Sequence, residues 1–225
     1  YGRGVLPPVA RTWHDPTTFR TISIPNAVIP PKGSVVVGVY DLIGLMFAYA
    51  PSDNLMIIGG GAAPLPDDWK GVNGQMYGAW SLGLKGGFQL FDRLDVVGGF
   101  QYGMSMYDRE ETKRIESRID VSTPYGALSY GDDDSRISIT AGYAFKRHRV
   151  LGQDGEVAEF HRDAPLVGIG GDYRFAARWK ICAEALSMRT LGHIPIATTV
   201  RFFGDTWALD AGVGYLGVTT GTDEP

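Results

Sequence analysis

The sequence predicts an all-β protein, specifically an antiparallel up-and-down transmembrane β-barrel of about 10–12 strands. Three observations support this prediction. Apolar and polar residues alternate with a period of two through most of the 225 residues, and helical periodicity is nearly absent. Tight-turn residues and longer polar stretches alternate between the predicted strands. The apolar side of most strands excludes charge, whereas the other side carries small residues and isolated charges.

Eleven strands are predicted in chain order: 18–26, 34–50, 54–63, 75–90, 94–107, 119–130, 136–147, 164–176, 179–190, 194–203 and 207–217. We see no linker, so residues 18–225 are interpreted as one barrel domain. Residues 1–17 are rich in proline and are expected to be irregular.

Two kinds of connection separate these strands. The short ones, such as Phe91-Asp92-Arg93 and Gly204-Asp205-Thr206, use residues that suit tight turns. The long ones are polar and cover 64–74, 108–118 and 148–163. Because the two kinds alternate, short turns should gather at one end of the sheet and long loops at the other.

The two faces of the strands differ in chemistry. In strand 136–147, the predicted apolar face consists of Ile137, Ile139, Ala141, Tyr143 and Phe145. Strands 34–50, 54–63 and 119–130 alternate poorly. A soluble β-sandwich would expose its polar face to bulk water and fill it with long polar side chains. Small residues and scattered charges instead suit a cramped polar interior, with the apolar face outside.

Eight charges are predicted to point into this interior: Lys85, Asp95, Asp172, Arg174, Lys180, Glu184, Arg201 and Asp210. Aromatic residues form two groups, as the two interfaces of a bilayer would favour. The group beside the short turns comprises Tyr49, Phe91, Tyr130, Phe175, Trp179, Phe203 and Trp207. The group near the long loops comprises Trp69, Trp80 and Tyr107. The alternative is that these aromatics cap the core of a soluble sandwich.

The stretches "FAYAPSDNLMIIGGG" (Phe47–Gly61) and "GGFQLFDRLDVVGGF" (Gly86–Phe100) resemble strand–turn–strand units of small, poorly characterised, porin-like outer-membrane β-barrels of Gram-negative bacteria. The segment Thr21–Pro66 is similar to the opening of such barrels, and the resemblance of pattern covers about residues 18–217. It implies secretion, insertion into the bacterial outer membrane and periplasmic short turns. It implies no catalytic residues.

Barrels of this kind have an even number of strands. Eleven predicted strands therefore leave two interpretations open. Either a twelfth strand is missing from the sequence, or 18–26 is not a membrane strand and ten strands close. We prefer the first interpretation.

Other candidate sites are weak. The G-x-G-x-x-G match at 212–217 opens no helix, so its glycines are interpreted as small interior positions. Asp132-Asp133-Asp134 is expected to be a solvated turn, and no metal, cofactor or catalytic site is predicted. The single cysteine, Cys182, excludes an internal disulfide. The basic run Lys146, Arg147 and Arg149 is predicted to contact lipid phosphates at the outer rim.

The predicted function is that of an outer-membrane protein with a structural or assembly role and a narrow or charge-plugged lumen. One alternative is a porin-like channel for small solutes. A second is a rim enzyme that acts on lipid through His148 or His161, although the preferred interpretation is not an enzyme. The expected partners are outer-membrane lipid, lipopolysaccharide and proteins of a membrane assembly. The net charge of −4 argues against nucleic acid.

Overall fold

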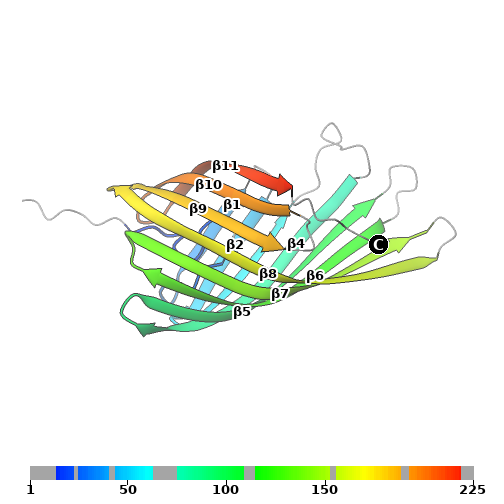
Figure 1. The fold of residues 1–225 in the computed structure, drawn as a ribbon, viewed down its shortest axis with the longest axis horizontal. Coiled ribbons are helices and arrows are strands. Elements are labelled where there is room, and N and C mark those ends of the chain that lie inside the picture. The colour runs from blue at the N-terminus through cyan, green and yellow to red at the C-terminus, as the bar shows by residue number, and fades with distance from the viewer. Residues whose placement is uncertain are drawn as a thin grey trace, which may run out of the picture.

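The computed structural model describes residues 14–22, 25–40, 44–62, 75–108, 115–152, 156–188 and 193–218. These ranges form a single sheet of eleven antiparallel strands in sequence order, and they contain no helix that could cross a membrane (Figure 1). The predicted all-β, up-and-down architecture is therefore confirmed.

The strands are β1 (Val35–Tyr40), β2 (Gly44–Ser52), β3 (Leu55–Ala62), β4 (Gln75–Phe91), β5 (Leu94–Asp108), β6 (Ile115–Gly131), β7 (Ser135–Leu151), β8 (Val157–Ala176), β9 (Trp179–Met188), β10 (His193–Phe203) and β11 (Ala208–Val218). Each one pairs with the next along the chain. No ladder joins β1 to β11 within the described ranges.

The short turns lie at one end of the sheet, which we call the short-turn end; the opposite end is the long-loop end. At the short-turn end, Arg93 has a positive φ of 71° and Gly131 a φ of 140°. A Cβ at Gly131 would lie 2.0 Å from the carbonyl oxygen of Ser135, so this turn requires glycine. At the long-loop end, β6, β7 and β8 project beyond β9–β11 (Figure 1).

That projection corrects the predicted loop at 148–163. β7 continues to Leu151 and β8 begins at Val157, so most of the expected loop is a paired extension of the hairpin. Charged cross-strand pairs support this extension. Arg149 lies opposite Glu159, and their side chains are 3.1 Å apart. The polar residues of this stretch predicted a loop, whereas most of them belong to two paired strands.

The exposure of side chains follows the predicted alternation. On β7, Ile137 and Ile139 are 53% and 52% exposed, while Ser138 and Thr140 between them are buried. We call the side with exposed large apolar residues the outer face, and the opposite side the inner face. Exposed large apolar side chains occur on the outer face of every strand except β3 among the described residues.

Two predicted strands are wrong. The range 34–50 divides into β1 and β2, which pair as a hairpin with Val35 opposite Tyr49. The predicted strand ran through Asp41 and Gly44, two residue types that suit a turn, and so missed the division. Of the predicted range 18–26, the described residues 18–22 and 25–26 form turns, bends and irregular backbone rather than a strand of the sheet, apart from an isolated bridge between Arg20 and Pro25.

Residues 14–22 and 25–34, which we call the inner segment, lie against the inner face. Phe19 packs on Ala48 and Met56 from β2 and β3, and Ala27 packs with side chains of β5 and β6. The same segment also contacts β9 and β10 on the far side of the sheet. The sheet therefore curls around the inner segment, and the buried apolar core lies between the two.

Candidate functional site

The inner segment is anchored by a buried ion cluster, and Arg201 on β10 lies at its centre. Its guanidinium donates two hydrogen bonds to Asp210 of β11, at 2.7 and 3.0 Å. It also donates to the carboxylate of Asp15 at 3.1 Å and to the carbonyl of Thr21 at 2.7 Å. One fully buried arginine thus joins two strands to two points of the inner segment.

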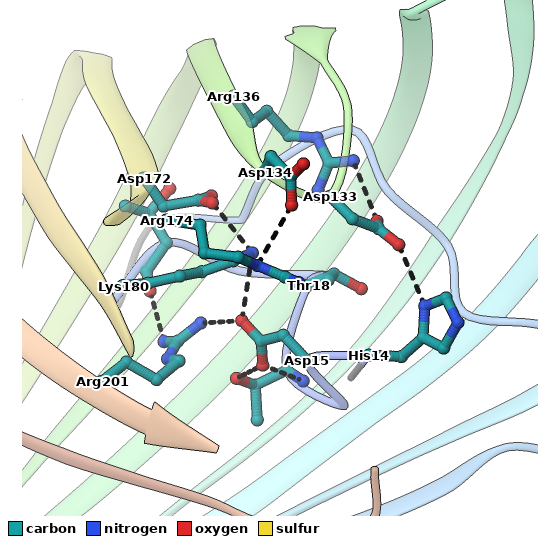
Figure 2. A network of polar contacts seen from close by, with 12 residues as sticks. His14, Asp15, Thr18, Asp133, Asp134, Arg136, Asp172, Arg174, Lys180 and Arg201 are labelled. Atoms are coloured by element: carbon teal, nitrogen blue, oxygen red, sulfur yellow. Dashed lines mark hydrogen bonds and ion pairs between the residues drawn. The ribbon is translucent and has the colours of Figure 1, made fainter. Parts of the chain in front are cut away.

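Lys180 on β9 completes the cluster. Its ammonium group is 2.9 Å from the carboxylate of Asp172 on β8 and 3.4 Å from that of Asp15. Figure 2 shows Lys180 and Arg201 converging on Asp15 from two strands. Because a buried charge is tolerated when it is paired, Asp15 helps to compensate both cations, and it thereby links the inner segment to β9 and β10.

Asp15 is also fixed locally. Its Oδ1 accepts hydrogen bonds from the backbone N–H of Thr17 at 2.9 Å and from the Thr17 hydroxyl at 2.7 Å. Burial alone would raise the pKa of Asp15, but the charges of Arg201 and Lys180 and the two Thr17 bonds outweigh it. The pKa of this carboxyl is therefore lowered, and the cluster forms with Asp15 ionised.

Lys85 on β4 is a second anchor. Its ammonium group donates to three main-chain carbonyls of the inner segment: Phe19 at 3.1 Å, Asn26 at 3.0 Å and Val28 at 2.6 Å. The ammonium has three donors, and all three are used. These contacts bring Phe19 and the stretch from Asn26 to Val28 together at one point on the sheet.

Side chains of the sheet pair with other backbone groups of the inner segment. Glu184 accepts the N–H of Ile22 at 2.9 Å, Ser129 accepts the N–H of Ala27 at 2.8 Å, and Thr140 donates to the carbonyl of Pro25 at 2.7 Å. An irregular buried segment has no neighbouring strand to pair with its backbone N–H and C=O groups, so these side chains form the hydrogen bonds instead. At Gly170, a Cβ would lie 3.0 Å from the Thr21 hydroxyl, so a small residue makes room for the segment.

All eight predicted interior charges lie on the inner face. Five of them contact the inner segment directly: Lys85, Lys180, Glu184, Arg201 and Asp210. The partner of Asp210 is Arg20 of that segment, and their charged groups are 3.6 Å apart. Asp172 acts through Lys180. Arg174 and Asp95 lie nearer the short-turn end, where they line a cavity of about 480 Å³.

The Asp132–Asp134 turn is exposed to solvent, and its carboxylates also make specific contacts. Asp134 lies 3.1 Å from Arg174, and Asp133 lies 3.2 Å from His14 of the inner segment. The pKa of Asp132 is lowered, first by the backbone N–H groups of Asp134 and Ser135 and also by Arg93. The turn thus holds the start of the inner segment at the short-turn end (Figure 2). No metal-binding cluster occurs among the described side chains.

The predicted aromatic positions have mixed outcomes. The residues exposed on the outer face are Tyr49, Phe91, Tyr130, Phe175, Trp179, Trp207 and Trp80. Phe203 is instead buried on the inner face, with Arg174 5.0 Å and Lys180 5.8 Å from its ring. Strand alternation places it there because its neighbour Phe202 faces outward and stacks on Trp179 at 4.5 Å. Trp69 and the Tyr107 side chain lie outside the described residues.

The basic run on β7 also divides between faces. Arg147 and Arg149 lie on the outer face, 3.0 and 3.1 Å from Glu159, which also contacts His161. Nearby, Arg118 and Tyr102 both bond to Asp120. These side chains border an outer cavity of about 390 Å³. Lys146 alternates toward the inner face, although it also lines this cavity.

One contact was missed by sequence reasoning. The Ser117 hydroxyl on β6 lies 2.7 Å from Nε2 of His148 on β7, near the long-loop end. The phenyl ring of Phe160 lies 6.2 Å from the imidazole ring. No carboxylate within the described ranges pairs with His148. Ser117 and His148 are thirty-one positions apart, so only the strand register brings them together.

No family model matches the chain, and no curated protein matches it.

Proposed function

We propose that this chain is an integral β-barrel protein of a bacterial outer membrane, with a structural or assembly role and a lumen closed by its own inner segment. The observation that carries the proposal is the outer face. Its exposed side chains are large and apolar around the sheet, while the buried side chains of the inner face are mostly small, polar or charged, with Met56, Val97, Leu166 and Phe203 as the large apolar exceptions.

A water-soluble monomer rarely exposes a contiguous apolar patch larger than a few hundred Å². Here the exposed apolar surface continues over neighbouring strands, so a soluble protein would have its hydrophobic side in water. A bilayer gives this face a favourable solvent. The apolar band on β7 runs from Ile137 to Phe145 and ends at Arg147. That is about nine residues, which matches the length of a tilted strand crossing a bilayer.

Vesicle flotation tests the membrane placement directly. The protein, refolded with phospholipid vesicles, should rise with the lipid in a density gradient and resist extraction by alkaline carbonate. It should enter the detergent phase on phase separation. A protein that stays in the aqueous phase without detergent would contradict the proposal.

The position of the inner segment favours a closed lumen rather than an open channel. It occupies the interior from the short-turn end to about the middle of the strands, where Thr140 and Glu184 hold it. Planar-bilayer recordings should therefore be silent for the intact protein. The Lys85→Met variant, which loses three bonds to the segment, should give intermittent current. Steady single-channel steps from the unmodified protein would support a porin-like channel instead.

Lipopolysaccharide is the proposed lipid partner at the outer rim. Arg147 and Arg149 stand just beyond the apolar band, where lipid phosphates lie, and guanidinium groups bind phosphate well. Replacing both with Gln should weaken binding of lipopolysaccharide but not of its dephosphorylated form. Equal loss for the two lipids would argue against phosphate recognition.

The Ser117–His148 contact favours a second candidate function, a rim esterase acting on lipid. A serine hydroxyl within hydrogen-bond reach of an imidazole is the first requirement of a serine nucleophile. Hydrolysis of a short-chain phospholipid that disappears in both Ser117→Ala and His148→Ala would support it. Absence of hydrolysis by the intact protein would rule out the esterase function.

A further inference from the structure

The cavity of about 480 Å³ at the short-turn end is bordered by charged side chains from several parts of the chain. It is lined by the Asp132–Asp134 turn, by Asp95 of β5, by Arg136 of β7 and by His14 of the inner segment. We call it the short-turn cavity. Its volume lies within the range of small-molecule sites, which is about 300–1,000 Å³. The cavity therefore has room for a ligand.

The Arg136 side chain lines this cavity without an acceptor at hydrogen-bond distance. It is only 6% exposed, and its Nε and Nη1 atoms are buried with no hydrogen-bond partner. Within the described ranges its one ion pair is long, 3.9 Å from Nη2 to Asp133. Figure 2 shows Asp133 between Arg136 and His14. A buried guanidinium in this state costs free energy that a bound acceptor would offset.

The cross-strand neighbour of Arg136 does not fill this role. Asp172 on β8 lies opposite Arg136 in the ladder, but its carboxylate is 2.9 Å from the ammonium group of Lys180. Residues 1–13, which precede His14 in the chain, contain no aspartate or glutamate. That stretch therefore has no side-chain carboxylate to offer Arg136.

Most other charges around the cavity are joined in pairs. The pairs are Arg93 with Asp132 at 3.5 Å, Arg174 with Asp134 at 3.1 Å, and His14 with Asp133 at 3.2 Å. Asp95 differs, because it forms no hydrogen bond or ion pair with any residue that the structure describes. It lies within electrostatic range of Arg136, yet no ion pair joins the two. The cavity thus holds a cation and a carboxylate that both lack a close partner.

This arrangement limits the chemistry of a ligand. A purely anionic molecule would meet Arg136 but would also face the carboxylates of Asp95 and Asp133. A purely cationic molecule would leave Arg136 without an acceptor. A molecule with both charges could give Arg136 a carboxylate and Asp95 an ammonium group, and hydrogen bonds between such charged groups are strong.

We propose that the short-turn cavity binds a small zwitterion, with its carboxylate on the Arg136 guanidinium and its ammonium group on the Asp95 carboxylate. Amino acids and related amino carboxylates have this chemistry. In an outer-membrane barrel the short-turn end faces the periplasm, so the ligand there is a periplasmic solute. The site itself depends only on the residues around the cavity and not on the membrane placement.

A series of zwitterions tests the site. The probes are glycine, β-alanine and γ-aminobutyrate, in which the distance between ammonium and carboxylate groups increases. They are titrated into the full chain in nonionic detergent micelles, and binding is followed by saturation-transfer NMR of the ligand. At least one of the three should bind saturably, and the best of them shows which separation of charges fits the cavity.

Single-charge molecules provide the matched controls. Acetate carries the carboxylate alone and methylammonium the cation alone. Each should bind at least about tenfold more weakly than the best zwitterion at the same ionic strength, because each leaves one of the two side chains without a partner.

Two variants assign the charges. Arg136→Met should weaken binding of the best zwitterion about tenfold or more. Asp95→Asn should weaken it to a similar extent and should also remove the preference over acetate, because acetate no longer faces that carboxylate. A loss of structure alone would not change this preference. Arg162→Met, on β8 toward the long-loop end, should bind like the unmodified protein.

Three results would overturn the proposal. The first is absence of saturable binding by all three zwitterions, which would assign the cavity to water. The second is acetate binding as tightly as the best zwitterion, which would indicate a simple anion site. The third is unchanged binding in the Asp95→Asn variant. Should Arg136→Met fail to fold, the ligand series with unmodified protein still decides between these results.

Vesicle flotation keeps this inference separate from the proposed function. A protein that floats with vesicles but binds no zwitterion overturns only the ligand site. One that binds a zwitterion but does not float overturns only the membrane placement.

Discussion

Lys85 is fully buried, and its ammonium group serves three carbonyl oxygens of the inner segment. Strand alternation was enough to predict that this charge faces inward. It could not predict the acceptors, because backbone carbonyls are present at every residue and leave no signature in a sequence. The function of the side chain, which is to hold a segment some sixty positions away, depends entirely on the fold.

The Lys85→Met change should therefore lower the free energy of unfolding by about 2–4 kcal/mol, since it removes three charge-assisted bonds and leaves buried carbonyls unpaired. Urea unfolding in detergent micelles, followed by tryptophan fluorescence, measures this loss. Lys146→Met is the matched control, because Lys146 is an inner-face lysine that lies nearer the long-loop end. An equal loss in both variants would show that Lys85 is not a specific anchor.

Acid should loosen the inner segment through Asp15. The pKa of Asp15 is lowered in the folded protein, so its contribution is complete above the unfolded value of about 3.9 and is lost as the pH falls through the lower folded value. Urea midpoints measured from pH 6 to pH 2 should fall below about pH 4. The Asp15→Asn variant should be less stable at pH 6 and should lose less on acidification. Parallel curves for the two proteins would assign the acid effect to other carboxyls.

At the scale of elements, β7 shows the simplest relation between sequence and structure. Its outer-face residues are apolar from Ile137 to Phe145, and its inner-face residues in that stretch are small or polar. Period-two alternation depends only on backbone geometry, which points successive side chains to opposite faces. The faces of such strands could therefore be read from the sequence, whereas the ends of β6, β7 and β8 could not.

A lysine substituted on the outer face of β7 should show whether lipid or water surrounds that face. Ala141→Lys should cost about 2–4 kcal/mol in phospholipid vesicles, because Ala141 is the central outer-face position of the apolar band. Phe145→Lys, at the edge of the band, should cost about 0–1 kcal/mol. Chemical unfolding of vesicle-bound protein measures both. If the outer face were in water, neither lysine would cost more than about 0.5 kcal/mol.

The inner segment shows where local pattern fails. The sequence around Thr21 alternates like a strand, yet its backbone groups pair with side chains such as Glu184 and Thr140 rather than with a neighbouring strand. Asp15-Pro16-Thr17 did carry a local signal, since an Asp side chain commonly accepts the N–H two residues later. That signal indicates a turn and does not place the turn inside a sheet.

At the scale of the whole molecule, the two edges should be the least protected strands. The N–H groups of Val35, Val37 and Val39 point away from β2, toward the side of β1 that has no ladder within the described ranges, whereas the central strands are paired on both sides. Hydrogen–deuterium exchange in micelles should therefore be fastest in β1 and β11 and slowest in β5–β8. Uniform protection would indicate that the edges are already paired.

The sequence by itself determined the all-β class, the order of most strands, and which face of each regular strand is apolar. These properties follow from alternation and turn chemistry, which act between near neighbours. The tertiary structure decided that the inner segment lies against the inner face of the sheet, that Asp15 joins Lys180 and Arg201, that Phe203 turns inward, and that no ladder joins β1 to β11 within the described ranges. Those features depend on how the sheet curls and on contacts between residues far apart in the chain. A local sequence pattern reflects only interactions between near neighbours, so it does not specify them.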